Sequence, residues 1–235
     1  MNEPIRVTVP APIADVWPAL RDPALIRRWH GWETDEGGGL DGEIEFIFLK
    51  NGIADEEAHT LHVGGHLFTL QDQGSQTVVE VTRTTPPADD SMDWAAFYDD
   101  IDEGWRSFVE QLRFAVTHQW GRDRRTLHLD GESIADPPVP VADALGLGNA
   151  AALQPGERYA ANVAGEHISG DVWFRSQHQL GLTVDAWGPG LLLLAEAPNS
   201  GRRNASATLT MYDDGERDAQ WRDAWAQAYR SPEPA

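Results

Sequence analysis

The sequence predicts an α+β fold with two domains, each a curved antiparallel sheet with short N-terminal helices and a C-terminal helix packed across the sheet. Three observations lead to this prediction. A long amphipathic helix is expected near the middle of the chain, two independently placed turns give one sheet register, and the order of elements repeats after the long helix. With 235 residues, 41% of them hydrophobic, the chain has enough apolar material for such cores.

The first domain is predicted to open with a strand and two short helices. Residues 5–9 alternate apolar and polar side chains, and Pro10 ends the strand. Apolar residues from Ile13 to Leu20 recur at helical spacing. Asp22 followed by Pro23 is typical of a helix start, with the aspartate as N-cap and the proline at the first helical position.

The next segment is predicted to be antiparallel sheet, and it begins with a strand in which Ile44, Phe46 and Phe48 share one face. Gly64-Gly65 and Gly74-Ser75 are typical of hairpin turns. Although the two turns are read independently, they predict one register and one apolar face. The predicted pairs are Val63 with His66, Leu61 with Phe68, His59 with Leu70, Leu70 with Val79, and Phe68 with Val81.

A long amphipathic helix is predicted over Met92–His118. Asp89, Asp90 and Ser91 offer side-chain oxygens for its N-cap. Its apolar stripe is formed by Phe97, Ile101, Trp105, Phe108, Leu112 and Ala115 or Val116.

The order of elements predicts two domains, at residues 1–118 and 126–235, joined by a polar linker at 119–125. The second domain is expected to begin with a strand at Leu127 and Leu129 and a short helix within 138–147, and to end with a helix over 216–229. Between them, strands are predicted near 159–163, 169–174, 179–185, 191–197 and 205–212.

The composition excludes several classes of function. A net charge of −20 repels nucleic-acid phosphates and anionic membrane surfaces, so neither nucleic-acid binding nor membrane insertion is expected. Because the chain has no cysteine, it can form no disulfide, thiolate metal site or cysteine nucleophile. The first residues do not resemble a signal peptide, and a cytoplasmic location is expected. The sheet edges could be covered by a protein partner or a second copy of the chain.

Two motifs near the N-terminus are similar to motifs of a known protein superfamily. They are Ala14-Asp15-Val16-Trp17-Pro18-Ala19-Leu20 and Asp22-Pro23-Ala24-Leu25-Ile26-Arg27-Arg28-Trp29. With the sheet and the long helix that follow, the first half resembles the START-like helix-grip (SRPBCC) superfamily, in a branch similar to activators of the 90-kDa heat-shock protein ATPase. The second half shares the element order, as a degenerate repeat would. The resemblance implies a cavity between sheet and long helix that holds an apolar small molecule. It implies no specific reaction.

The resemblance and the predicted register together give a set of candidate ligand-binding residues. These residues are Trp29, Phe46, His59, Leu61, His66, Phe68, Val81 and Trp105. His59 or His66 would supply a polar contact in a mostly apolar pocket, whereas His62 faces the other side of the sheet. Because the three histidines cannot converge on one ion in this register, no metal site is expected. Trp32 and Trp94 could also line the pocket.

The leading hypothesis is therefore binding of a small hydrophobic or amphipathic ligand by a carrier, sensor or regulator. The sequence contains no nucleophile elbow, dinucleotide fingerprint or phosphate-binding loop, so no cofactor and no assigned catalytic residue are predicted. Two alternatives stay open. One is an enzyme of the cyclase or hydratase kind that uses a cavity histidine. The other is a protein-interaction module that acts through its exposed surface.

Overall fold

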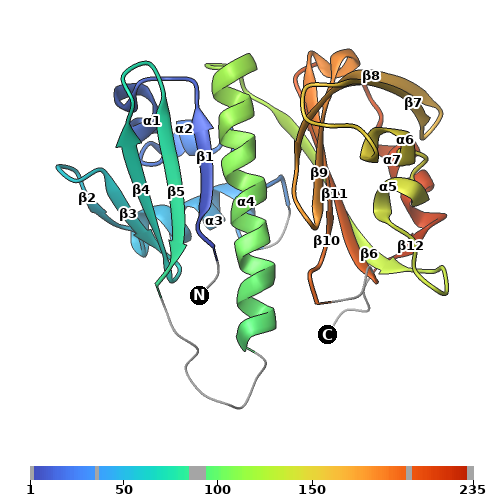
Figure 1. Cartoon of the computed structure of the whole chain (residues 1–235), viewed down its shortest axis with the longest axis horizontal. Helices are drawn as coiled ribbons and strands as arrows, with labels where there is room; N and C mark the ends of the chain where they lie inside the picture. Colours follow the sequence, from blue (N-terminus) through green and yellow to red (C-terminus); the bar gives the residue numbers. More distant parts are fainter. Residues whose placement is uncertain (1–2, 35–36, 85–93, 200–202, 232–235) are drawn as a thin grey trace. The chain divides into compact units, whose positions relative to one another are not determined.

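The computed structural model describes residues 3–34, 37–84, 94–199 and 203–231. The chain forms two compact units, Met1–Asp123 and Arg124–Ala235, each with its own antiparallel sheet and helices (Figure 1). This is the α+β class that the sequence predicts. Within the described residues, no helix is both long and apolar enough to cross a membrane.

The first unit contains a five-stranded antiparallel sheet with the strand order β1-β5-β4-β3-β2. The predicted register is confirmed, because Val63 pairs with His66 and Leu61 pairs with Phe68, which in turn lies opposite Val81. The elements are β1 (Ile5–Val9), α1 (Ile13–Ala19), α2 (Pro23–Ile26), α3 (Gly39–Ile44), a π-helical turn (Glu45–Lys50), β2 (Ile53–Asp55), β3 (Thr60–Val63), β4 (His66–Asp72), β5 (Thr77–Arg83) and α4 (Trp94–His118).

One prediction in this unit is wrong. The segment with Ile44, Phe46 and Phe48 is helical, in α3 and the π-helical turn, and is not a strand. Leu40, Ile44 and Phe48 are spaced four residues apart, and all three are at most 2% exposed, so the segment buries one helical face. Phe46 lies off that face and is 64% exposed.

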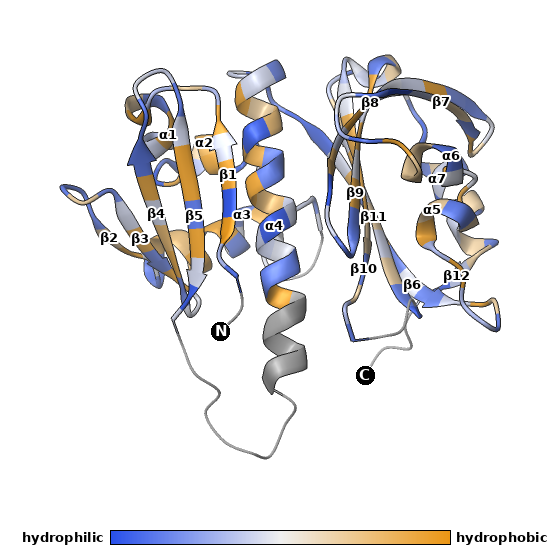
Figure 2. Ribbon diagram, in the orientation of Figure 1, coloured by the Kyte–Doolittle hydropathy of each residue, from blue (hydrophilic) through white to orange (hydrophobic). Residues whose placement is uncertain are grey.

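The long helix α4 packs along β1 and β5. Of the predicted stripe, Trp105, Leu112 and Ala115 are buried in the core of the first unit, and Ile101, Phe108 and Val116 pack partly buried against it. Val109, which is not in the predicted stripe, is also fully buried. Figure 2 shows apolar and polar residues alternating along this helix. The predicted N-cap residues Asp89, Asp90 and Ser91 lie outside the described residues.

The second unit contains a seven-stranded antiparallel sheet with the strand order β12-β6-β11-β10-β9-β8-β7. The predicted strands and helices of this half are all found, within a few residues at their ends. They are β6 (Arg125–Ser133), α5 (Val141–Ala144), α6 (Gly148–Ala151), β7 (Arg158–Val163), β8 (Glu166–Arg175), β9 (Gln179–Val184), β10 (Gly190–Glu196), β11 (Asn204–Met211), α7 (Asp218–Ala226) and β12 (Tyr229–Arg230), with a 3-10 turn at Asp185–Trp187.

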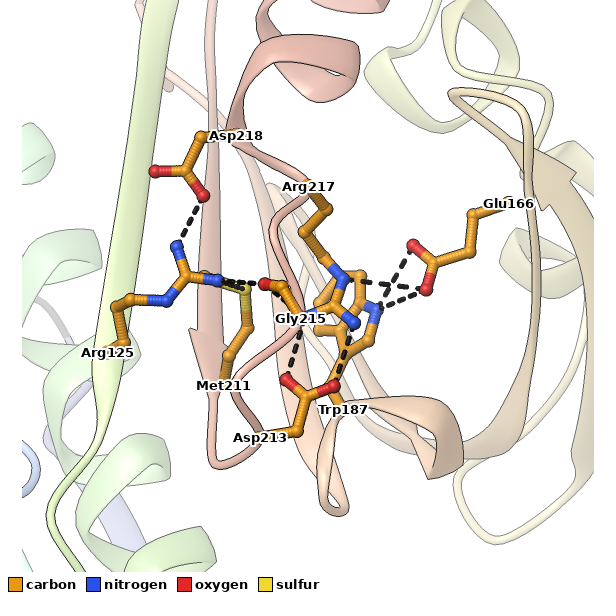
Figure 3. Close-up of polar contacts among 8 residues, drawn as sticks. All are labelled: Arg125, Glu166, Trp187, Met211, Asp213, Gly215, Arg217 and Asp218. Atoms are coloured by element: carbon orange, nitrogen blue, oxygen red, sulfur yellow. Dashed lines mark hydrogen bonds and ion pairs between the residues drawn. The ribbon is translucent and has the colours of Figure 1, made fainter.

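A polar network fixes the start of α7 in the second unit (Figure 3). Arg217, only 7% exposed, donates from its two terminal nitrogens to Asp213, at 2.7 and 2.8 Å, and lies 3.5 Å from Glu166. Its guanidinium also lies over the ring of Trp187, whose indole N–H donates to Glu166. This network joins α7 to β8 and to the turn before β10, so that Trp221 and Trp225 of α7 pack in the core.

Candidate ligand-binding site

Three strands of the first unit present a row of buried apolar side chains. The register places Leu61, Phe68 and Val81 next to one another across β3, β4 and β5, and none is more than 2% exposed. Successive side chains of a strand point to opposite faces of the sheet, and the register places these three candidate residues on the same face. They form the sheet side of the candidate site.

Trp105 of α4 supplies the opposite side. Its ring centroid lies 4.9 Å from that of Phe68 in an edge-to-face arrangement, and 6.2 Å from that of Phe48. It also lies 5.8 Å from the ring of Phe108, one helical turn along α4. Edge-to-face contacts of this kind are the favoured geometry of aromatic pairs, so the rings fix each other's orientation.

Trp29 and His30 enter the same region from the chain directly after α2. Trp29 donates its indole N–H to the Ala19 carbonyl at 2.8 Å, which holds its ring 5.9 Å from that of Phe48. His30 is fully buried, with its ring centroid 4.5 Å from Phe108 and 4.8 Å from Phe48. We call Trp29, His30, Phe48, Phe68, Trp105 and Phe108 the aromatic cluster.

His30 was not among the candidate residues, yet it is the polar member of this cluster. Its Nε2 atom lies 3.1 Å from the carboxylate of Glu43 on α3. The only signal in the sequence was its position directly after Trp29. The burial of His30 does not follow from that position. It depends on α3 and the π-helical turn, which the sequence predicts as a strand.

His66 is 1% exposed and lies at the edge of the aromatic cluster, with its ring 6.0 Å from that of Trp105. Its Nε2 atom lies 2.7 Å from Asp102 of α4, and its Nδ1 atom lies 3.2 Å from the Gly64 carbonyl. Asp102 also pairs with Arg83 at the end of β5. The three side chains therefore join β4, β5 and α4 beside the cluster.

His59 lies apart from the cluster, which corrects its expected position on the core side of a strand. It is in the turn before β3, with a left-handed backbone at φ 50°, and its ring packs against the edge of Trp17 at 5.4 Å. The Trp17 indole donates to Glu56 at 2.6 Å, and this bond holds the pKa of the Glu56 carboxyl below its usual value. His62 faces away, as predicted, and its Nε2 atom lies 2.8 Å from the Thr84 hydroxyl.

An open groove of about 960 Å³ borders the cluster on the side of α3. Phe46 and Lys50 of the π-helical turn line it, together with Trp32 and Glu43. Two of these residues connect the groove to the cluster, because Glu43 contacts His30 and the Trp32 ring lies 6.1 Å from that of Phe108. Phe46 lines this groove, whereas the other candidate residues are not part of its lining.

The arrangement suits recognition of an apolar molecule with a small polar part. In the groove itself, Trp32 and Phe46 provide the apolar contact area, and Glu43, which contacts His30 of the buried cluster, provides a polar contact. Among the residues that the structure describes, no three histidine, aspartate or glutamate side chains are placed to hold a metal ion together.

No protein-family model matches this chain, and no curated protein matches it significantly. Three solved structures align over most of its length at low identity. BexL, a di-domain ARO/CYC from the BE-7585A biosynthetic pathway, is 12% identical with a TM-score of 0.37, over 97% of this chain and 93% of BexL. StfQ, a di-domain ARO/CYC from the steffimycin pathway, is 10% identical with a TM-score of 0.33, over 96% and 92%. DynU16, from the dynemicin biosynthetic locus, is 15% identical with a TM-score of 0.32, over 95% and 94%.

Proposed function

We propose that the first unit binds a small hydrophobic or amphipathic molecule at the groove beside the aromatic cluster. The observation that carries this proposal is His30, a fully buried imidazole that lies among aromatic rings and contacts Glu43, a residue of the groove wall. The contact with Glu43 offsets the cost of burying the imidazole, and it connects the buried cluster to a carboxylate that a ligand in the groove would contact.

The charges of the groove restrict the ligand. Of the described residues, Asp41, Glu43 and Glu45 line it together with the cation Lys50, so this lining disfavours an anionic ligand. Trp32 and Phe46 offer apolar surface for the body of the ligand. A neutral or cationic amphipathic molecule fits this combination best, with its polar end near Glu43.

The geometry of His66 favours binding over catalysis by that residue. Both of its ring nitrogens face an acceptor, Asp102 on one side and the Gly64 carbonyl on the other. A general base needs a nitrogen lone pair directed at the substrate. In this arrangement, His66 holds α4 against the sheet, and the cyclase or hydratase alternative would require it to break one of these contacts.

A titration with Nile red, a neutral hydrophobic dye, tests the proposal. We expect saturable binding to the full chain, and Phe46→Ala should raise the Kd about tenfold because a bound molecule covers this ring. Ile53→Ala is the matched control, since Ile53 is 73% exposed and lies outside the groove lining. Native mass spectrometry of the purified chain shows in parallel whether a small molecule copurifies.

Equal affinities of the two variants, or no binding by the wild type, would contradict the proposal. In that case, the exposure of the apolar side chains Phe46, Leu49 and Ile53 would favour the protein-interaction alternative.

A further inference from the structure

A cleft in the second unit combines an apolar floor with charged side chains on two walls. It has a volume of about 360 Å³ and lies between the helices α5 and α6 on one side and the ends of β8, β9 and β10 on the other. Figure 1 shows α5 and α6 on the same side of this sheet. Leu180 and Leu194 lie opposite each other on β9 and β10, are at most 7% exposed, and form the floor. The volume is near the lower end of the usual range for ligand pockets, so it suits a small molecule.

Asp143 of α5 contributes a carboxylate to this cleft. The side chain forms no hydrogen bond or ion pair with any other described residue. Its position follows from Gly148, the first residue of α6, because a Cβ atom there would lie 2.1 Å from the Asp143 Oδ1 atom. The glycine thus lets the carboxylate lie directly against the start of α6. The negative charge at this end of the cleft has no cation beside it in the described part of the chain.

Arg175 contributes the opposite charge from the end of β8, where it lies opposite Leu180. Its Nη1 atom donates to the Leu153 carbonyl, just beyond α6, at 3.0 Å. The guanidinium forms no ion pair with a described residue, whereas Arg158 of the neighbouring strand β7 pairs with Asp185. A guanidinium has five N–H donors, and the contact with Leu153 uses one of them. The others are available to an anionic group in the cleft.

The two charges lie at opposite ends of α6. Asp143 lies against residue 148 and Arg175 contacts residue 153, and five helical residues at 1.5 Å each span roughly 8 Å. This separation is too long for a direct ion pair, which needs about 4 Å or less. Two charge-assisted hydrogen bonds of about 2.8 Å, one at each end, leave about 2–3 Å between the groups of a ligand that joins them. Groups at that separation are attached to the same carbon atom.

We propose that this cleft binds a zwitterionic α-amino acid with an apolar side chain. The ligand carboxylate accepts hydrogen bonds from Arg175, and the ligand ammonium group donates to Asp143. The apolar side chain packs on Leu180 and Leu194. This site is in the second unit, and it does not rest on the function proposed for the first.

Two further ionisable residues of the lining agree with this assignment. His178 lies three residues after Arg175, and its imidazole has no hydrogen-bond partner among the described residues, so it can donate to the same ligand carboxylate. Ser176 fixes the turn that carries both, because its Oγ atom accepts from the backbone N–H groups of residues 178 and 179. Glu196 accepts a hydrogen bond from the Val141 N–H at 2.8 Å. With Asp143 it disfavours a ligand that carries only a carboxylate.

Equilibrium dialysis of the full chain with L-phenylalanine tests this site. We expect saturable binding to the wild type. Phenethylamine lacks the carboxylate and 3-phenylpropanoate lacks the ammonium group, so each should bind about tenfold more weakly. This comparison needs no variant and therefore does not depend on the folding of one.

Two variants assign the two contacts. Arg175→Gln and Asp143→Asn should each raise the Kd for L-phenylalanine about tenfold. Arg175→Gln should not weaken the binding of phenethylamine, and Asp143→Asn should not weaken that of 3-phenylpropanoate, because each analogue lacks the group that the changed residue contacts. Arg222→Gln and Asp223→Asn are the matched controls and should leave the Kd unchanged, since both residues are exposed on α7 and lie outside the cleft lining.

Absence of saturable binding by the wild type, or equal affinity for the three compounds, would overturn the proposal. Unchanged affinity for L-phenylalanine in both cleft variants would overturn it as well. Phe46→Ala separates this site from the groove of the first unit. If L-phenylalanine binding fell in Phe46→Ala and not in the cleft variants, the amino acid would bind to the first unit, and the site in the second unit would be disproved.

Discussion

At the scale of single residues, the two buried tyrosines of the second unit differ in what their hydroxyl groups contact. Tyr159 and Tyr229 are 4% and 2% exposed, so both hydroxyls have lost contact with bulk water. Only that of Tyr159 recovers a hydrogen bond to another described residue. The two side chains therefore provide an internal comparison of a satisfied and an unsatisfied phenol.

We expect Tyr159→Phe to lower the free energy of unfolding by about 1–2 kcal/mol, because it leaves the buried Thr183 carbonyl without this donor. Tyr229→Phe should change that free energy by less than about 0.5 kcal/mol, or increase it, because no hydrogen bond to the described chain is lost. Urea denaturation of both variants, without added ligand, measures the difference. An equal loss in both would mean that the Tyr229 hydroxyl has a partner in solution.

The candidate site of the first unit could be predicted from the sequence only in part. Leu61, Phe68 and Val81 were placed together because two hairpin turns fix their register. Trp105 was placed opposite them by helical spacing. His30 could not be found in this way, because its burial depends on Glu43 and Phe48, and the segment that carries both was assigned to the wrong secondary structure.

At the scale of elements, that error has a simple physical origin. Ile44 and Phe48 are four residues apart, a spacing that is compatible with one face of a strand and also with one face of a helix. Phe46 favoured the strand, whereas Leu40 extends the spacing of four and favours the helix. The helix forms because Leu40, Ile44 and Phe48 together reach the core, while Phe46 remains at the groove.

The Arg217 network gives a prediction for α7. Arg217→Ala should lower the free energy of unfolding by about 2–3 kcal/mol, because it leaves Asp213 and Glu166, 27% and 20% exposed, without their shared cation. Arg158→Ala is the control. Arg158 also pairs with a carboxylate, at 2.7 Å from Asp185, but its side chain is 59% exposed and its loss should have little effect. Chemical denaturation measures both, and similar effects would contradict the structural role of Arg217.

The same network should make the free energy of unfolding depend on pH in the acidic range. The hydrogen bonds from Arg217 hold the pKa of Asp213 below its usual value of 3.8. A carboxyl group with a lowered pKa in the folded state stabilises the fold above its ordinary pKa, and this contribution is lost as the pH falls through the lowered value. In Arg217→Ala, the loss of stability below pH 3.8 should be smaller than in the wild type.

At the scale of the whole molecule, each unit has a core of its own. One cluster contains Trp29, Phe68 and Trp105, and the other contains Trp187, Trp221 and Tyr229. We therefore expect the fragments 1–123 and 124–235 to fold separately, each with a cooperative thermal transition. Circular dichroism during heating tests this, and a fragment that melts without a transition would contradict it.

The repeated element order was recognisable because each half carries its own strands, turns and amphipathic helix, and these patterns are local. The ligand could not be predicted from the sequence, because a pocket is formed by side chains that are distant in the sequence. Trp32 and Phe108, or Val141 and Glu196, contact each other only after the fold has formed.

The wall of the groove also contains the only lysine of the chain. Lys50 has a side chain that is 64% exposed, and its Nζ atom lies 3.1 Å from Glu45. Reagents that acylate ε-amines can therefore attach to one side chain only, and the attachment point is in the candidate binding groove. A fluorophore coupled in this way would sit beside Phe46 and report directly on occupancy. Immobilisation through the Lys50 side chain would, for the same reason, block the groove.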